Sequence, residues 1–123
     1  MSDKLGSKWL AQCDLLPDEQ EVWSCLANRT QGRWRAVGGK LFLTNKRLVF
    51  LPHFFDAMLS GDQWLAERGN VAKVDTVQPD GGMFSGGLRE RVAVHLKDGS
   101  TSLFVVTDPR DTAHKLQEAG LPK

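Results

Sequence analysis

Apolar residues recur at two spacings along the chain, and the change in spacing predicts a long β-rich part followed by a helix. Over residues 92–97 larger apolar side chains alternate with smaller or polar ones, which is the period-two pattern of a half-buried strand. Asp98-Gly99 then predicts a tight turn, and residues 102–106 supply the partner strand. This stretch therefore reads as a late β-hairpin.

A second hairpin is predicted over residues 33–52 in the middle of the chain. Two apolar runs flank Thr44-Asn45-Lys46-Arg47, a tight turn in which Asn45 tolerates left-handed dihedral angles. The pair Gly38-Gly39 predicts a bulge or bend within the first strand, and Pro52 ends the second. This hairpin is the clearest local element of the sequence.

Shorter signals complete the expected order of elements. Further strands are expected over residues 22–29, 63–66 and 71–77. Asp108-Pro109 predicts the start of a C-terminal helix, because aspartate accepts from free amides at a helix start and proline suits the first helical position; Gly120 ends that helix. At the other end of the chain, residues 7–16 place apolar side chains at helical spacing before Pro17.

About seven antiparallel strands followed by one helix predict a mainly β fold. Sheet edges must be closed or covered, and a small bent barrel with the helix across one open end meets that need. We therefore expect a barrel domain over residues 16–123, preceded by an N-terminal helical extension over residues 1–15. The chain shows no internal repeat, low-complexity tract or linker.

Composition narrows the class of protein without changing this picture. The chain has 123 residues, 41% of them hydrophobic and 25% charged, as in soluble globular domains. It has no apolar run of the roughly 20 residues that a membrane-spanning helix needs. Cys13 and Cys25 lack metal-ligand spacing and are too few for a disulfide framework. We interpret them as small core residues of a reduced, cytoplasmic protein.

The formal net charge of +1 conceals an uneven distribution of charge. Residues 22–55 contain six basic residues and no acidic one, whereas the segments on both sides carry an excess of acid. One interpretation is that the acidic neighbours fold back and neutralise the basic stretch. The other is a local surface for an anionic ligand, since charge within about a Debye length is what a ligand senses.

The order of elements and two motifs resemble the GRAM and bacterial pleckstrin-homology-like domains. The central pattern is Gly-Lys-Leu-Phe-Leu-Thr-Asn-Lys-Arg-Leu-Val-Phe over residues 39–50, preceded by Leu-Pro-Asp-Glu-Gln at residues 16–20. The turn at residues 97–100 and the strand at residues 104–106 also fit, so the resemblance covers about residues 15–120. It implies a pleckstrin-homology superfold, a barrel closed by a C-terminal helix.

Such domains are non-enzymatic modules that bind phosphoinositides, other lipids or protein segments. The resemblance implies a basic site near the first hairpin, and Arg29, Arg33 and Arg35 are similar to that pattern with a shorter first gap. Arginine can take phosphate oxygens in a bidentate manner. Three such residues bind a membrane weakly, so a hydrophobic contribution is needed. The candidates for it are Phe54, Phe55, Met83 and Phe84.

The sequence therefore leaves two classes of function open. The first is weak binding of an anionic lipid headgroup, with peripheral association with a membrane. The second is a protein-interaction or self-association module, which could use Met83-Phe84 on its glycine-rich loop or accept a strand at an exposed sheet edge. Nucleic acid is an unlikely partner, because acidic segments flank the basic stretch.

Signals for catalysis or a cofactor are weak. His53, His95 and His114 are isolated in the sequence, and His95 falls on the polar side of its predicted strand. The glycine pairs of residues 81–87 lack the lysine and hydroxyl of a phosphate-binding loop. We expect no enzyme activity, no cofactor and no metal site.

Overall fold

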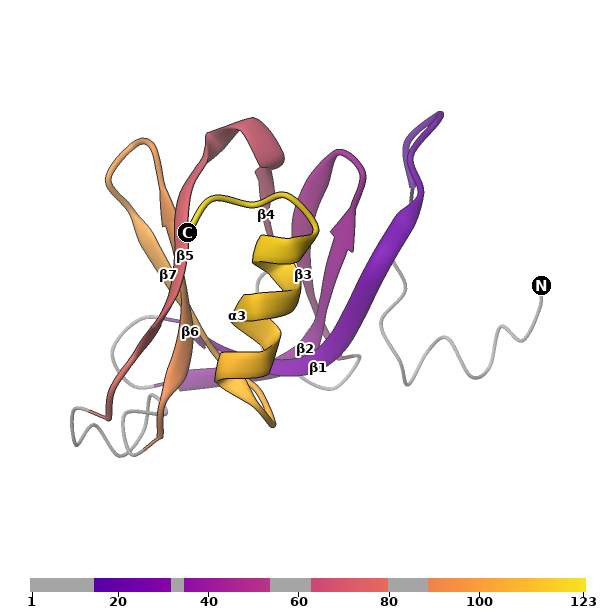
Figure 1. Cartoon of the computed structure of the whole chain (residues 1–123). Coiled ribbons are helices and arrows are strands. Elements are labelled where there is room, and N and C mark those ends of the chain that lie inside the picture. The colour runs from indigo at the N-terminus through magenta and orange to yellow at the C-terminus, as the bar shows by residue number, and fades with distance from the viewer. Residues whose placement is uncertain (1–14, 32–34, 54–62, 80–88) are drawn as a thin grey trace.

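The computed structural model describes residues 15–31, 35–53, 63–79 and 89–123. Within these ranges lie seven strands, one short 3-10 turn and one helix (Figure 1). Their bounds are β1 (Glu21–Gln31), β2 (Arg35–Thr44), β3 (Arg47–Pro52), β4 (Trp64–Glu67), η1 (Arg68–Asn70), β5 (Val71–Val77), β6 (Arg91–Leu96), β7 (Thr101–Val105) and α3 (Pro109–Glu118). Residues 7–14 of the helix expected over residues 7–16 fall outside the described residues, and Leu15 and Leu16 are not helical.

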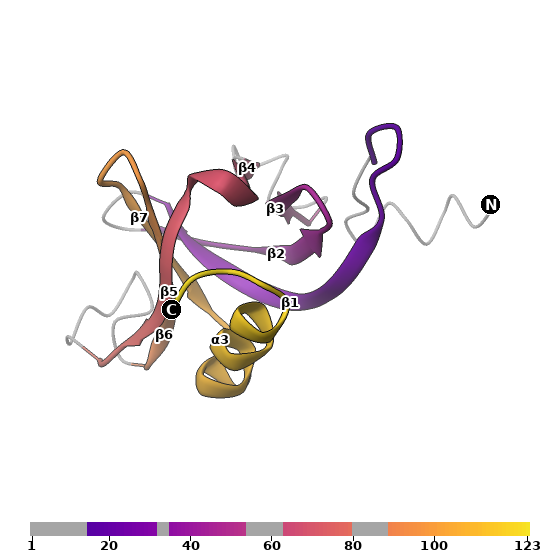
Figure 2. The ribbon, with the colours of Figure 1, turned by 45° about the horizontal axis from the view of Figure 1, so that its top comes forward.

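All seven strands belong to one antiparallel sheet in the order β4-β3-β2-β1-β7-β6-β5. The long strand β1 joins its two halves, which face each other, and α3 lies across the open side (Figures 1 and 2). The expectation of a mainly β fold with a C-terminal helix is therefore confirmed. The sheet is open in its hydrogen bonding, since β4 and β5 are its two edges, so a closed barrel is not confirmed.

The hydrophobic core fills the inner face of this bent sheet. Three aromatic rings meet there, with ring centroids of Phe104 lying 5.8 Å from Phe50 and 5.3 Å from Trp64. Ala113 and Leu116 of α3 are buried against the same cluster, together with Leu121 after the helix. Burial of these apolar side chains from both halves and the helix is what holds the two halves together.

The helix begins and ends as its sequence predicts. The side chain of Asp108 accepts a hydrogen bond from the amide of Asp111 at 3.1 Å, and Pro109 is the first helical residue. Gly120 has a φ of +114°, a left-handed conformation that glycine adopts at low cost.

The central hairpin differs in two details from what the sequence predicts. Of the bulge or bend predicted at Gly38-Gly39, the bulge is absent, since the pairing of β2 shows no register shift there. Glycine is needed at position 39 for a different reason, because a Cβ there would collide with the carbonyl oxygen of Leu51 and lie 2.8 Å from Pro52 Cα. Asn45 does not adopt a left-handed conformation, since Asp18 is the only described non-glycine residue with positive φ.

Strand β6 is more buried than its alternating pattern predicts. Its first four residues, Arg91–Val94, are all buried, so both faces of the strand are covered there. His95 is half-buried and not a simple surface residue, because both of its ring nitrogens have side-chain partners. The period-two pattern located the strand correctly but gave the wrong exposure.

Candidate functional site

The three arginines of the predicted anionic site do not all face solvent. Arg29 lies on β1 opposite Val37 and Phe104, on the inward-facing side of the strand that also carries Ala27. It is half-buried, and its guanidinium carbon lies 5.8 Å from the centroid of the Trp64 ring, a cation–π contact. Arg29 therefore contacts the aromatic end of the core, and its assignment as a headgroup ligand remains a prediction.

The other predicted site residues are mostly beyond what the structure describes. Arg35 is placed on β2 opposite Gln31 by its backbone alone, and Arg33 lies outside the described residues. Phe54, Phe55, Met83 and Phe84 also lie outside them. Convergence of Arg33 and Arg35 on one surface remains a prediction.

Part of the central positive charge is neutralised within the fold. The Glu19 carboxylate, buried before β1, accepts from Arg47 Nε at 2.8 Å and Arg47 Nη2 at 3.0 Å. It also accepts from the Thr44 hydroxyl at 2.5 Å and from the Leu16 amide at 2.7 Å. These hydrogen bonds, that from Arg47 first, lower the pKa of Glu19 to about 2. The acidic neighbour Glu19 therefore does fold back onto the basic stretch, where it pairs with Arg47.

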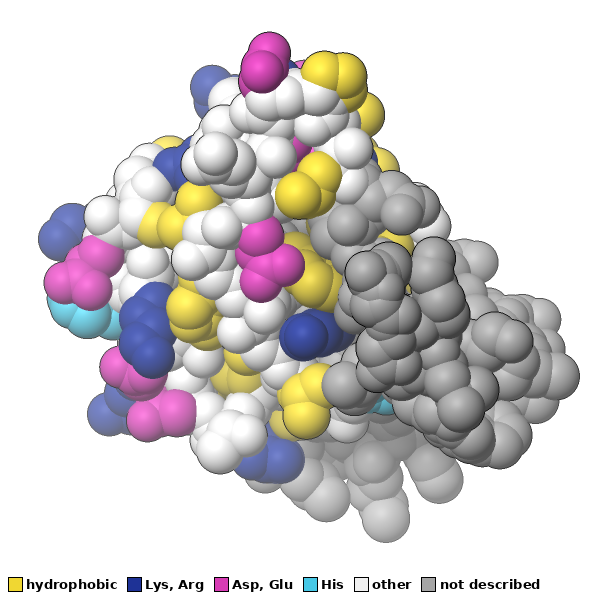
Figure 3. All heavy atoms as spheres, turned by 90° about the vertical axis from the view of Figure 1, so that its right-hand side faces the viewer, with side chains coloured by type: hydrophobic (Ala, Val, Ile, Leu, Met, Phe, Trp, Pro, Cys, Tyr) yellow, Lys and Arg dark blue, Asp and Glu magenta, His cyan; other side chains and the backbone are white. Residues whose placement is uncertain are grey.

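Figure 3 shows one face of the molecule, the right-hand side of Figure 1. In its described part, hydrophobic side chains alternate with charged side chains of both signs. Among the basic residues of the central stretch, Lys40 has its ammonium 5.4 Å from the centroid of the Phe42 ring. The described part of this face therefore has no continuous basic field of the kind that attracts an anionic membrane.

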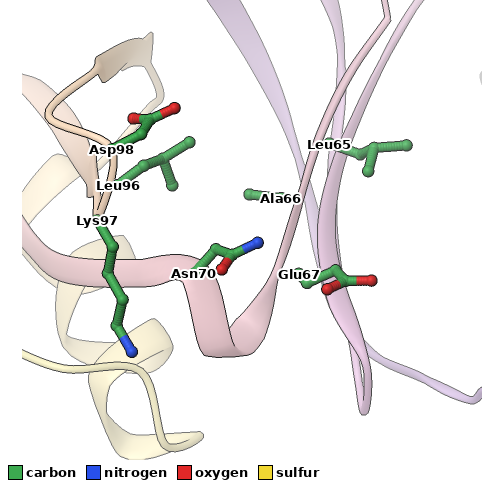
Figure 4. A pocket seen from close by; sticks show the side chains of 7 residues that line it. All are labelled: Leu65, Ala66, Glu67, Asn70, Leu96, Lys97 and Asp98. Atoms are coloured by element: carbon green, nitrogen blue, oxygen red, sulfur yellow. The ribbon is translucent and has the colours of Figure 1, made fainter.

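A hollow of about 470 Å³ lies beside the edge strand β4 (Figure 4). Three parts of the chain enclose it: β4, the turn η1, and the start of the β6–β7 turn. The lining residues are Leu65, Ala66, Glu67, Asn70, Leu96, Lys97 and Asp98. Ala66 and the Asn70 amide point into the space between η1 and β4, whereas the Leu65 and Glu67 side chains point to the other side of β4. The volume falls within the range of ligand pockets.

This hollow was not foreseen from the sequence. The sequence did predict a short strand ending near Ala66, and β4 spans four residues. Natural sheets often keep their edge strands short. The signal in the sequence for an edge strand here was the short length of β4, followed by the Arg68-Gly69-Asn70 turn. Where the edge would face depended on long-range packing that the local pattern does not encode.

A second groove runs between β1 and α3. Strands β1 and β7 pair only at Asn28 and Arg29, and before that point they diverge. The groove, of about 360 Å³, is lined on the β1 side by residues 23–26 and on the other by Val106–Asp108 and the first half of α3. It contains the thiol of Cys25, whose pKa burial raises to about 11. A thiol whose pKa is raised in this way carries little reactive thiolate near neutral pH.

A third cluster crosses β5, β6 and β7 on the face opposite Val74 and Val94. His95 Nε2 lies 2.8 Å from Asp75 Oδ1, and His95 Nδ1 lies 3.0 Å from the Thr101 hydroxyl. Burial acts to raise the pKa of Asp75, but hydrogen bonds from His95 and Lys73 outweigh it, and the pKa lies below its usual value. The Thr101 side chain is exposed on a regular strand.

The described residues contain no group of three or more His, Cys, Asp or Glu side chains arranged to hold a metal ion. Among them, too, no helix has the length and apolar character required to cross a membrane.

Comparison with known proteins establishes the fold and not the family. No family model and no curated protein matches the chain. Among solved structures it is similar to the C-terminal domain of an unknown protein from Leishmania infantum, with 17% identity, a TM-score of 0.61 and 84% of each chain covered. It is also similar to the hSac2 domain of the human phosphoinositide phosphatase Sac2, with 16% identity, a TM-score of 0.58, and 85% of this chain and 70% of that chain covered. These similarities and the seven-stranded antiparallel sheet indicate a β-sandwich or pleckstrin-homology-like fold.

Proposed function

We propose that this chain is a non-catalytic binding module of the GRAM and pleckstrin-homology-like superfamily whose ligand is an extended segment of a partner protein. The observation that carries the proposal is an open sheet edge, β4, beside a hollow of about 470 Å³. A free strand edge offers backbone donors and acceptors, and such edges bind extended peptides.

The proposal includes the closer architecture that the sequence pattern suggests. The GRAM-like pattern of residues 39–50 falls on β2 and β3, and the late turn that fits the resemblance joins β6 to β7. In a pleckstrin-homology-like barrel, the two halves of this sheet would meet at a seam between β4 and β5. The turn η1 connects those strands, and the hollow lies beside it.

A second candidate is weak binding of an anionic lipid headgroup through Arg33 and Arg35, with peripheral association of a cytoplasmic protein with a membrane. It is favoured by the absence of any carboxylate from residues 22–55, and by the likeness to a domain of a phosphoinositide phosphatase. It ranks second because Arg29 contacts Trp64 and Arg47 is paired with Glu19. The described face in Figure 3 carries charges of both signs, which disfavours nucleic acid as a partner.

Selection from a displayed library of random short peptides, followed by fluorescence anisotropy of the enriched sequences, tests the first candidate. We expect enriched peptides to bind with dissociation constants of about 1–100 μM, typical of short segments that lose conformational freedom on binding. Failure to enrich any peptide that binds in solution would contradict the proposal.

Sedimentation with phosphatidylcholine vesicles containing phosphatidylinositol phosphates tests the second candidate. If the chain binds a peptide and not a lipid, we expect it to sediment with these vesicles no more than with vesicles of phosphatidylcholine alone. Sedimentation that is lost in the double variant Arg33→Glu, Arg35→Glu and kept in Arg29→Gln would establish the lipid function instead.

A further inference from the structure

The hydrogen-bonding pattern of β4 shows which of its backbone groups are open. The Arg68 amide donates to the Lys46 carbonyl at 3.0 Å, so this pair belongs to the hydrogen-bonded set of the β3–β4 ladder. In an antiparallel ladder such pairs alternate with non-bonded ones, so Ala66 and Trp64 also direct their backbone groups toward β3. The amides and carbonyls of Leu65 and Glu67 therefore point away from β3, along the open edge.

The opposite edge of the sheet is covered by the chain itself. On β5 the Val74 amide donates to the Pro122 carbonyl at 2.8 Å, and the Val74 carbonyl accepts from the Gln117 side-chain amide at 2.7 Å. The segment after α3 thus occupies the position that an added strand would take on β5. No described residue does the same for Leu65 or Glu67 on β4. Within the described part of the chain, this asymmetry leaves β4 as the edge that can accept a strand.

The hollow beside β4 also provides places for side chains. Successive side chains of an added strand would point to opposite faces of the sheet. Those on the inner face would meet Ala66, Leu96 and the Asn70 amide (Figure 4). Those on the outer face would lie beside Leu65, which is 45% exposed. Both positions favour apolar side chains.

The charges around the hollow are mixed. Lys97 and Asp98 are both exposed there, whereas the Glu67 side chain points to the other side of β4 (Figure 4). The bound segment is therefore selected by its backbone and its apolar side chains and not by its charge.

We propose that β4 accepts an extended segment of a partner protein as an added strand, hydrogen-bonded to the backbone of Leu65 and Glu67. The segment carries apolar residues at alternating positions. This inference rests on the proposed function and specifies where and how the ligand binds.

The β1–α3 groove is the competing position. Gly38 accepts from the His53 amide, so the even-numbered residues of β2 direct their backbone groups toward β3 and the odd-numbered ones toward β1. The odd-numbered residues of β1 pair with those of β2, and the backbone groups of Ser24 and Leu26 therefore point toward the groove. The pairing of β7 at Asn28 closes one end of that groove, and α3 forms its opposite wall. An added strand needs a spacing of about 4.8 Å from its neighbour along its whole length. The described helix, α3, packs against β5 and β6 and not along β4.

A proline at position 67 tests the proposal with little cost to the fold. Glu67 has a φ of −66°, close to the angle that proline requires, and its amide points away from the β3 ladder. Glu67→Pro therefore removes one outward donor and leaves the pairing with β3 intact. Glu67→Gln is the matched control, because it removes the charge and keeps the amide. Leu26→Glu reports on the β1–α3 groove.

We expect Glu67→Pro to weaken the binding of a selected peptide by about tenfold or more, and Glu67→Gln and Leu26→Glu to change it by less than about threefold. Equal binding by Glu67→Pro and the parent chain, with an unchanged unfolding midpoint, would overturn strand addition at β4 while leaving the proposed function intact. Loss of peptide binding in Leu26→Glu would show that the peptide binds in the β1–α3 groove. That result would also overturn strand addition at β4 and leave the proposed function intact. If the parent chain binds no peptide at all, it is the proposed function that fails.

Discussion

Arg47 Nε lies 2.8 Å from Glu19 Oε2, and this buried pair ties the segment before β1 to the turn between β2 and β3. The Thr44 hydroxyl donates to the same carboxylate and accepts from the amides of Lys46 and Arg47. The hairpin turn and the entry to β1 are thus held by one carboxylate.

Replacement of Glu19 by glutamine should therefore destabilise the domain. It leaves the Arg47 guanidinium largely buried without its carboxylate, a change that costs roughly 3 kcal/mol or more. Urea unfolding measures the loss, with Glu21→Gln as the control because Glu21 is exposed. Equal unfolding midpoints for the two variants would contradict a structural role for the pair.

The same pair predicts how stability depends on pH. The pKa of Glu19 is about 2 in the folded protein and 4.5 for the free side chain, so its contribution is complete above about pH 4.5. That contribution is lost as the pH falls from 4.5 toward 2. Unfolding free energies measured across this window should fall more steeply in the parent chain than in Glu19→Gln. If the unfolding free energies of the two proteins changed in parallel with pH, the pKa of Glu19 would not differ between the folded and unfolded states, and the prediction would be wrong.

Gly39 should not tolerate even the smallest side chain. A methyl group there collides with the backbone carbonyl of Leu51, which cannot move without disturbing the β2–β3 ladder. We expect Gly39→Ala to cost about 1–3 kcal/mol. Gly69→Ala is the control, since a Cβ at that position meets nothing within 4 Å and φ is not positive. A thermal midpoint for Gly39→Ala equal to that of Gly69→Ala would contradict the close approach.

Cys25 should react slowly with alkylating reagents. Burial raises the pKa of its thiol from 9.0 to about 11, so the thiolate fraction near neutral pH falls by about a hundredfold. Iodoacetamide labelling of a Cys13→Ser variant, followed by mass spectrometry, measures the rate at Cys25 alone. Labelling as fast as that of a free thiol peptide would contradict the buried placement.

Local patterns in the sequence predicted most of the elements, because alternation, turn residues and helix-start residues act over a few positions. The hairpin of β2 and β3, the turn at Asp98-Gly99 and the start of α3 at Asp108 were all found in this way. Exposure was harder to predict, since the buried face of β6 depends on what covers it. The same limit applies to Arg29, whose contact with Trp64 joins strands far apart in the sequence.

The candidate site could not be predicted, because it depends on which edge the rest of the chain leaves open. The sequence indicated that some edge strand could accept a peptide, without showing which one. The coverage of Val74 by Pro122 and Gln117 is a contact across 43 or more residues, and it distinguishes β5 from β4. Long-range pairing of this kind is set by the whole topology and not by a local motif.

Amide hydrogen exchange at β4 tests strand addition most directly. In the free domain the amides of Leu65 and Glu67 should exchange rapidly, while the Ala66 amide, directed toward β3, exchanges slowly. Saturation with a selected peptide should slow the exchange of Leu65 and Glu67 by about tenfold or more and leave Ala66 unchanged. Unchanged exchange at Leu65 and Glu67 in the saturated complex would contradict strand addition at β4.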